Sequence, residues 1–171
     1  MHKDNLPSKV DPFRFADNSL SVGGILPIKD MTRLCSSLGS DEGDVTVDLM
    51  FGIDEEGIRY VKGRMTTSLV LNCQRCLEPF KYEIIGDFML GIVRTDKEAD
   101  KLPDRYDPLC VPDLTLVVSD MIEDELIVSL PIVPMHKADD CKVRQSFEAC
   151  SNERENPFKV IESLRSKRSD K

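Results

Sequence analysis

The sequence predicts an α+β fold, in which an antiparallel β-meander packs against one long amphipathic helix, with short helices near the N- and C-termini. Three consecutive stretches within residues 45–93 alternate apolar and polar side chains and are separated by turn-like sequences, which is typical of antiparallel strands. Residues 116–130 instead carry apolar side chains at helical spacing. With 171 residues the chain can build one good core, so we predict a single domain over residues 1–150 and a C-terminal docking helix with a basic tail over residues 151–171.

The first forty residues predict an extended arm, a strand and a short helix. Prolines and polar residues up to Pro12 favour the extended arm. The following stretch SLSVGGILPIKD alternates like a strand until its two glycines and Pro27. Residues 27–38 are the candidate for the short helix, because apolar residues recur there at helical spacing and Gly39 follows as a stop signal.

The meander consists of three segments that follow one another along the chain. It begins with VTVDLMFGID, continues after the turn sequence DEEG with IRYVKGRMTTSLVLN, and ends with FKYEIIGDFMLGIV. Gly86, inside the third segment, predicts a β-bulge. A charged, proline-punctuated loop is expected next, before a short extended piece near residues 109–111.

The long helix predicted over residues 116–130 gathers its apolar side chains on one face and leaves acids on roughly the opposite face. The acids are Asp120, Glu123, Asp124 and Glu125. Pro131 ends the helix. Near the C-terminus, NPFKVIESLRSK combines a capping asparagine, a proline suited to the first helical position and a narrow apolar stripe, which predicts the docking helix.

Composition and charge restrict the class of protein. The most apolar stretch, residues 114–134, is interrupted by acids and cannot cross a bilayer. No apolar run follows the early charges of the N-terminus, so we predict no secretory signal, a cytoplasmic location and no membrane partner. The net charge of −8 argues against a protein that coats nucleic acid with its whole surface, so any RNA contact must be local.

Cys73 and Cys76 form a C-x-x-C pair in LNCQRCLEPF, at the bend between the second and third predicted strands. A reducing cytosol favours thiols or metal ligation over disulfides. Redox C-x-x-C pairs place one thiol at a helix N-terminus, where its pKa falls, whereas strands flank this pair on both sides. A C-x-x-C turn between strands is instead typical of a zinc knuckle, which supplies two of four ligands. Cys35 and Cys110 are expected to be buried and inert.

A second ligand pair follows the long helix in PMHKADDC. His136 and Cys141 have a spacing within the range of zinc ligand pairs, and Cys150 is a reserve ligand. The predicted metal ligands are Cys73, Cys76, His136 and Cys141, and the predicted cofactor is Zn²⁺. The alternative interpretation is that unligated thiols only pack the bend.

Residues 57–82 carry five basic residues against one acid, although the protein as a whole is acidic. On strands, several of these cations would share one face, which is either a solvated surface or a patch that contacts RNA phosphates. Tyr60 or Tyr82 could stack on bases beside such a patch. The candidate RNA-binding residues are Lys62, Arg64, Arg75 and Lys81.

Three separated motifs resemble the YceD family, the large ribosomal RNA subunit accumulation proteins of bacteria and plastids. They are LNCQRCLEPF, then MIEDELIVSLPIVPMH with a following DDC, then NPFKVIESL; the opening LPSKVDPFRFA and the overall length are also similar. The resemblance implies a cytosolic factor for synthesis, processing or stability of large-subunit (23S) ribosomal RNA, with no established catalytic reaction. It also supports the metal site, because relatives often carry cysteines where this chain has His136 and Cys141.

The preferred function is therefore a non-enzymatic ribosome-biogenesis factor without a small-molecule substrate. Its partner is large-subunit ribosomal RNA or its precursor, contacted directly through the basic residues or through a ribosomal or assembly protein. The alternative is an enzyme. The C-x-x-C pair would suit a thiol-disulfide oxidoreductase, and the helical acids would suit an RNA-processing hydrolase that uses acid–base or magnesium chemistry.

Overall fold

The computed structural model describes residues 6–142. Contacts group the chain into two units, residues 1–135 and residues 136–171. The first unit contains the sheets and α-helices described below, and the second contributes a 3₁₀ turn, Ala138–Asp140. The predicted docking helix and basic tail, and Cys150, lie outside the described residues.

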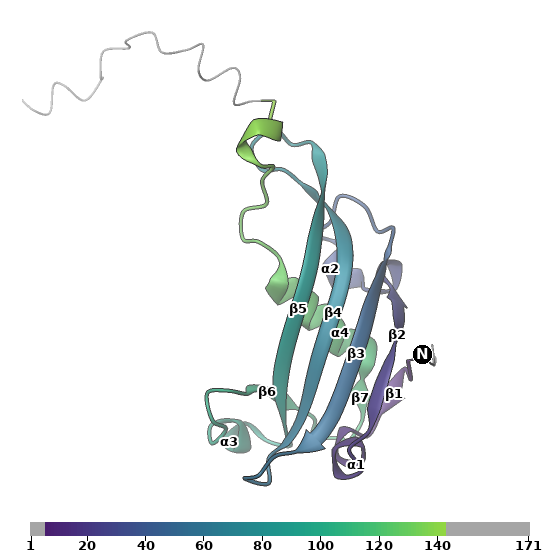
Figure 1. Ribbon diagram of the computed structural model, residues 1–171, viewed down its shortest axis with the longest axis vertical. Helices are drawn as coiled ribbons and strands as arrows, with labels where there is room; N and C mark the ends of the chain where they lie inside the picture. The colour runs from purple at the N-terminus through teal and green to yellow at the C-terminus, as the bar shows by residue number, and fades with distance from the viewer. Residues whose placement is uncertain (1–5, 143–171) are drawn as a thin grey trace, which may run out of the picture. The chain divides into compact units, whose positions relative to one another are not determined.

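A five-stranded sheet with the strand order β2-β3-β4-β5-β6 forms the body of the first unit (Figure 1). The strands are β2 (Ser21–Pro27), β3 (Asp44–Ile53), β4 (Arg59–Asn72), β5 (Pro79–Val93) and β6 (Asp107–Cys110). Strands β2 to β5 are antiparallel neighbours, which confirms the predicted meander and the α+β class. The short extended piece predicted near residues 109–111 is β6, which pairs with β5 in the parallel sense.

Strands β4 and β5 pair without interruption, from Tyr60 opposite Gly91 to Asn72 opposite Pro79. The bulge predicted at Gly86 is therefore wrong. Gly86 lies opposite Met65, and a Cβ atom there would stand only 2.9 Å from Met65 Cε. The glycine makes room for the methionine side chain in the core.

Helix α4 (Val118–Ser129) lies behind the sheet in Figure 1 and covers its inner face. It is shorter than the predicted helix over residues 116–130, because β7 (Leu116–Val117) pairs with β1 (Lys9–Val10) in a separate two-stranded sheet. The core includes Val47, Leu49, Phe51, Val61, Met65, Phe88, Met121, Ile122 and Leu126. Among the helices of residues 6–142, none has the length and apolar character needed to cross a bilayer.

Glu123 is buried, although the sequence pattern places the acids of the long helix on roughly the face opposite its apolar side chains. Its side chain is almost enclosed, and the whole residue is 5% exposed. The carboxylate accepts hydrogen bonds from the backbone N–H of Arg33 at 2.7 Å, from that of Leu34 at 3.0 Å and from the Arg33 guanidinium at 2.9 Å. Asp124 is exposed and also pairs with Arg33. Glu123 thereby fastens helix α2 (Thr32–Cys35) onto α4.

Helix α1 (Pro12–Asp17) begins where the predicted extended arm ends, and the sequence analysis did not predict it. Asp11 caps it, because its carboxylate accepts hydrogen bonds from the backbone N–H groups of Phe13 and Arg14, both at 3.1 Å. A capping aspartate followed by proline at the first helical position is a start signal that the sequence contains.

The helix predicted over residues 27–38 is largely replaced by other structure. Strand β2 continues to Pro27, and a 3₁₀ turn, Ile28–Asp30, follows it. Met31 then takes φ −98° and ψ 81°, outside the helical region, and separates this 3₁₀ turn from α2, which is a single helical turn.

Asp54 fixes the turn between β3 and β4. Its carboxylate accepts two backbone N–H groups of its own turn, at 2.8 and 3.0 Å, and also the Arg105 guanidinium and the Tyr106 hydroxyl, each at 2.8 Å. These bonds tie the turn to the segment between β5 and β6. That segment was predicted as a loop, but it also contains the one-turn helix α3 (Asp96–Ala99).

Replacing Asp54 with asparagine is expected to reduce stability least at acidic pH. Burial would raise the pKa of Asp54, but the hydrogen bonds from Arg105, Tyr106 and the turn outweigh it and lower the pKa to about 2. A lowered folded pKa gives stability that is fully present above the unfolded pKa of about 3.9 and is lost as the pH falls through about 2. Thermal unfolding should therefore show that the difference in melting temperature between wild type and Asp54→Asn becomes smaller as the pH falls through this range. A difference independent of pH would contradict the account.

Candidate metal centre and basic surface

The C-x-x-C pair lies in a tight turn between β4 and β5, and backbone hydrogen bonds close this turn. The Cys73 N–H donates to the Glu78 carbonyl at 2.9 Å, and the Leu77 N–H donates to the Cys73 carbonyl at 2.8 Å. The Arg75 N–H donates to Cys73 Sγ at 3.4 Å. The thiolate is the metal-binding form of a cysteine. The local geometry is therefore that of a knuckle between strands.

The chain that leaves α4 passes directly beside this turn. The Gln74 N–H donates to the Pro134 carbonyl at 2.9 Å, and His136 follows two residues later. Because one residue spans at most about 3.6 Å, the histidine begins close to the knuckle.

The structure brings the four predicted metal ligands together. The ligand atoms of Cys73, Cys76, His136 and Cys141 all lie within 4.8 Å of one another. Two of these residues, Cys73 and Cys141, are buried, and the other two are half-buried. Neighbouring ligand atoms around tetrahedral zinc stand roughly 3.8 Å apart, given Zn–S bonds of about 2.3 Å, so small shifts would complete the site. Three thiolates and one imidazole form a donor set that suits zinc. The cluster could therefore hold a metal ion.

The other two described cysteines do not behave as predicted. Cys110 is exposed on β6, and Cys35 is half-buried, so the prediction that both are buried is wrong. Cys110 lies on the edge strand, where the alternation of side chains directs Val111 inward instead. The Cys35 thiol donates to the Ile28 carbonyl at 3.2 Å, and burial raises its pKa.

Three of the candidate RNA-binding residues are exposed on the strands of the main sheet. Lys62 and Arg64 project from β4, and Lys81 projects from β5 near the knuckle. The Arg64 guanidinium donates to both carboxylate oxygens of Asp87, at 2.7 and 3.1 Å, which raises the pKa of Arg64 and lowers that of Asp87. Asp48 lies opposite Arg64 on β3. Arg64 thus lies between two carboxylates on this outer face.

The remaining candidates for RNA contact have close neighbours. Arg75 lies in the knuckle, where its Nε is buried and has no hydrogen-bond acceptor among the described residues. The Tyr60 ring stacks on Tyr106 with centroids 6.2 Å apart, and Tyr82 meets Phe80 edge-on at 6.5 Å. Both tyrosines that could stack on bases therefore already pack against another ring.

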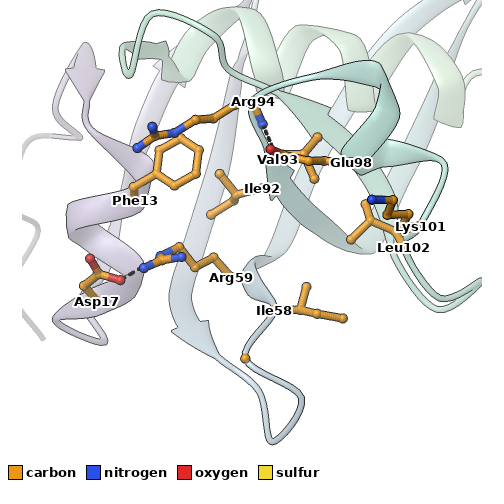
Figure 2. A pocket seen from close by; sticks show the side chains of 11 residues that line it. Phe13, Asp17, Ile58, Arg59, Ile92, Val93, Arg94, Glu98, Lys101 and Leu102 are labelled. Carbon is orange, nitrogen blue, oxygen red and sulfur yellow. Dashed lines mark hydrogen bonds and ion pairs between the residues drawn. The ribbon is translucent and has the colours of Figure 1, made fainter.

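A pocket of about 550 Å³ lies at the far end of β4 from the knuckle, roughly 45 Å away along the strand (Figure 2). The Arg94 guanidinium lies over the Phe13 ring, 4.9 Å from its centroid, and Arg59 pairs with Asp17 at 2.7 Å. The sequence analysis missed this pocket. Its walls come from α1, the β3–β4 turn and the segment around α3, and no local pattern links these segments.

A family model described as "Large ribosomal RNA subunit accumulation protein YceD" matches residues 61–165. The chain belongs to the YceD family. The matched range includes both the knuckle and the second ligand pair, so the YceD resemblance of the three motifs is confirmed. Among curated proteins, the chain is 33% identical over 174 residues to the large ribosomal RNA subunit accumulation protein YceD of Haemophilus influenzae, an alignment that covers 98% of this chain and 100% of the relative. No solved structure matches the chain.

Proposed function

We propose that this protein is a non-catalytic ribosome-biogenesis factor that supports the accumulation of large-subunit ribosomal RNA. The observation that carries the proposal is the whole-length similarity to a YceD protein whose name states this role. Because the alignment covers nearly all of both chains, the similarity extends to the knuckle, the sheet and α4 alike. The ratio of large- to small-subunit ribosomal RNA in cells depleted of the protein tests this function.

Two observations support a non-catalytic role over the enzymatic alternatives. Cys73 is 0% exposed and lies between two strands, whereas a reactive thiol is accessible and activated, often at a helix N-terminus. Glu123, the buried acid of the helical cluster, is bonded to Arg33 and to two backbone N–H groups. These partners neutralise the charge that a hydrolase would direct toward a metal or water.

The metal cluster fits a structural role for zinc. Four protein ligands would complete a tetrahedral shell and leave no position for a substrate, which is the pattern of structural zinc sites. Bound zinc would supply a crosslink without redox chemistry. Cys73 and Cys76 would hold the ion from the knuckle, while His136 and Cys141 would hold it from the chain that follows α4.

The proposed RNA contact is the outer face of the sheet, at Lys62, Arg64 and Lys81. These residues are exposed, and phosphate oxygens can replace the carboxylate of Asp87 at Arg64 with the same bidentate geometry. Contact through a basic ribosomal or assembly protein is the alternative route to the same function, and the following variants distinguish the two.

Charge variants on the outer face are expected to change RNA affinity in opposite directions. Lys62→Glu should weaken binding to a large-subunit ribosomal RNA transcript by about tenfold and reduce its salt dependence, because a phosphate contact is lost. Asp87→Asn should strengthen binding, because it releases Arg64 from its carboxylate partner. Filter binding at several salt concentrations measures both effects, and Lys29→Glu, an exposed lysine on the 3₁₀ turn that follows β2, is the matched control. If neither variant differs from the control, the direct contact is wrong and the partner-mediated route remains.

A further inference from the structure

Strand β2 is an edge strand of the five-stranded sheet and lacks the features that usually protect such an edge. It pairs with β3 on one side and is the outermost strand of that sheet (Figure 1). Its seven residues, SVGGILP, include no charged side chain, and proline occurs only at the last position. Soluble proteins usually protect an edge with charges, proline, bulges or a very short strand, because open edges recruit other strands.

Alternate residues of β2 turn their backbone groups toward this open edge. The Phe51 N–H donates to the Leu20 carbonyl, and the Ile28 N–H donates to the Gly43 carbonyl. The even-numbered residues of β2 therefore direct their backbone groups toward β3. The odd-numbered residues Ser21, Gly23 and Ile25 therefore direct their N–H and C=O groups outward. Within residues 6–142, no second strand or loop bonds to these groups.

The opposite edge of the same sheet is protected. Strand β6 has only four residues, Asp107–Cys110. Pro108 has no N–H to donate, and Asp107 adds a charge. The contrast singles out β2 as the edge that remains available for pairing.

The two ends of β2 carry opposite charges. The hollow beside Pro27 is lined by three acids and one lysine. The hollow beside Leu20 is lined by two cations and Asp11, whose carboxylate is bonded to the first N–H groups of α1. The acids are Asp41, Glu42 and Asp44, and the cations are Lys9 and Arg14.

We propose that a second copy of this chain pairs with β2 edge to edge, so that the two sheets join across a two-fold axis. The register centred on Gly23 places Ser21 opposite Ile25 of the other copy, pairs all the outward backbone groups and leaves Pro27 outside the bonded segment. Antiparallel pairing also sets the acidic end of one copy beside the cationic end of the other, which favours this orientation. The two-fold contact pairs the β2 edge of one copy with the β2 edge of the other, so neither β2 edge stays open and assembly stops at a dimer.

Sedimentation equilibrium of the full chain tests the dimer with two matched substitutions. Ile25 and Ile85 are 48% and 74% exposed and share the outer face of the sheet, but only Ile25 is on the edge strand. Ile25→Lys is expected to weaken self-association at least tenfold, and Ile85→Lys is expected to leave it unchanged. A wild-type monomer at all concentrations would overturn the proposal, and so would a dimer that Ile85→Lys disrupts and Ile25→Lys does not.

Amide hydrogen exchange locates the contact independently of any variant. Protection of the Gly23 and Ile25 amides should rise with protein concentration, whereas the Gly24 amide, which points toward β3, should be protected throughout. If the outward amides are protected equally at all concentrations, a segment of the same chain covers the edge, and the proposal is wrong.

Discussion

Cys73→Ser is expected to abolish stoichiometric zinc binding and to lower the melting temperature. The substitution removes a buried ligand whose sulfur lies within 4.8 Å of the three other ligand atoms. Loss of the bound ion withdraws about 3 kcal/mol of stabilisation when free zinc is about 100-fold above its dissociation constant. For a protein of this size the melting temperature should fall by roughly 10 °C.

Cys110→Ser is the matched control, because Cys110 is exposed on β6 and is not part of the cluster. This variant should keep one zinc ion per chain by elemental analysis and should melt like the wild type. Wild-type protein that binds no zinc, even when refolded with an excess of the ion, would contradict the metal centre and would favour packing thiols.

Glu123→Ala is expected to destabilise the protein by about 2–4 kcal/mol, as measured by urea unfolding. The variant leaves the backbone N–H groups of Arg33 and Leu34 without their acceptor and removes the buried partner of the Arg33 guanidinium. Asp124→Ala removes a carboxylate that also pairs with Arg33 but is exposed, so it should cost at most about 1 kcal/mol. Equal costs for the two variants would show that burial of Glu123 is not the source of its effect.

The stabilisation by Glu123 should also depend on pH. Burial would raise its pKa, but hydrogen bonds from Leu34 and Arg33 outweigh burial and lower the pKa below its ordinary value. The contribution is therefore fully present above the ordinary glutamate pKa of about 4.3 and is lost as the pH falls through the lowered folded value. The difference between wild type and Glu123→Ala should accordingly shrink in acid.

Local patterns predicted the sheet and the four residues that the fold brings together as candidate metal ligands, for a physical reason. Strands β3, β4 and β5 each have one face in the core, so buried and exposed side chains alternate along most of their length. The ligand pairs are detectable because zinc requires short, fixed spacings within each pair. The sequence does not show that the two pairs meet. They meet because the chain after α4 passes the knuckle, where the Gln74 N–H donates to the Pro134 carbonyl.

Features that depend on distant partners were not predictable in this way. The helical pattern places Glu123 away from the apolar face, and only the fold shows that Arg33, 90 residues away in sequence, binds and encloses it. Gly86 reads as a bulge, although its role is to accommodate Met65 of the neighbouring strand. The charge run of residues 57–82 likewise does not include Asp48 and Asp87. These two carboxylates lie on β3 and β5, which place them beside Arg64.

The most direct test of the proposed function is the ratio of large- to small-subunit ribosomal RNA in cells depleted of this protein. We expect large-subunit ribosomal RNA to fall relative to small-subunit RNA, and re-expression of the wild-type chain to restore the ratio. A ratio that stays unchanged in depleted cells, for both precursor and mature RNA, would contradict a role in accumulation of the large-subunit RNA.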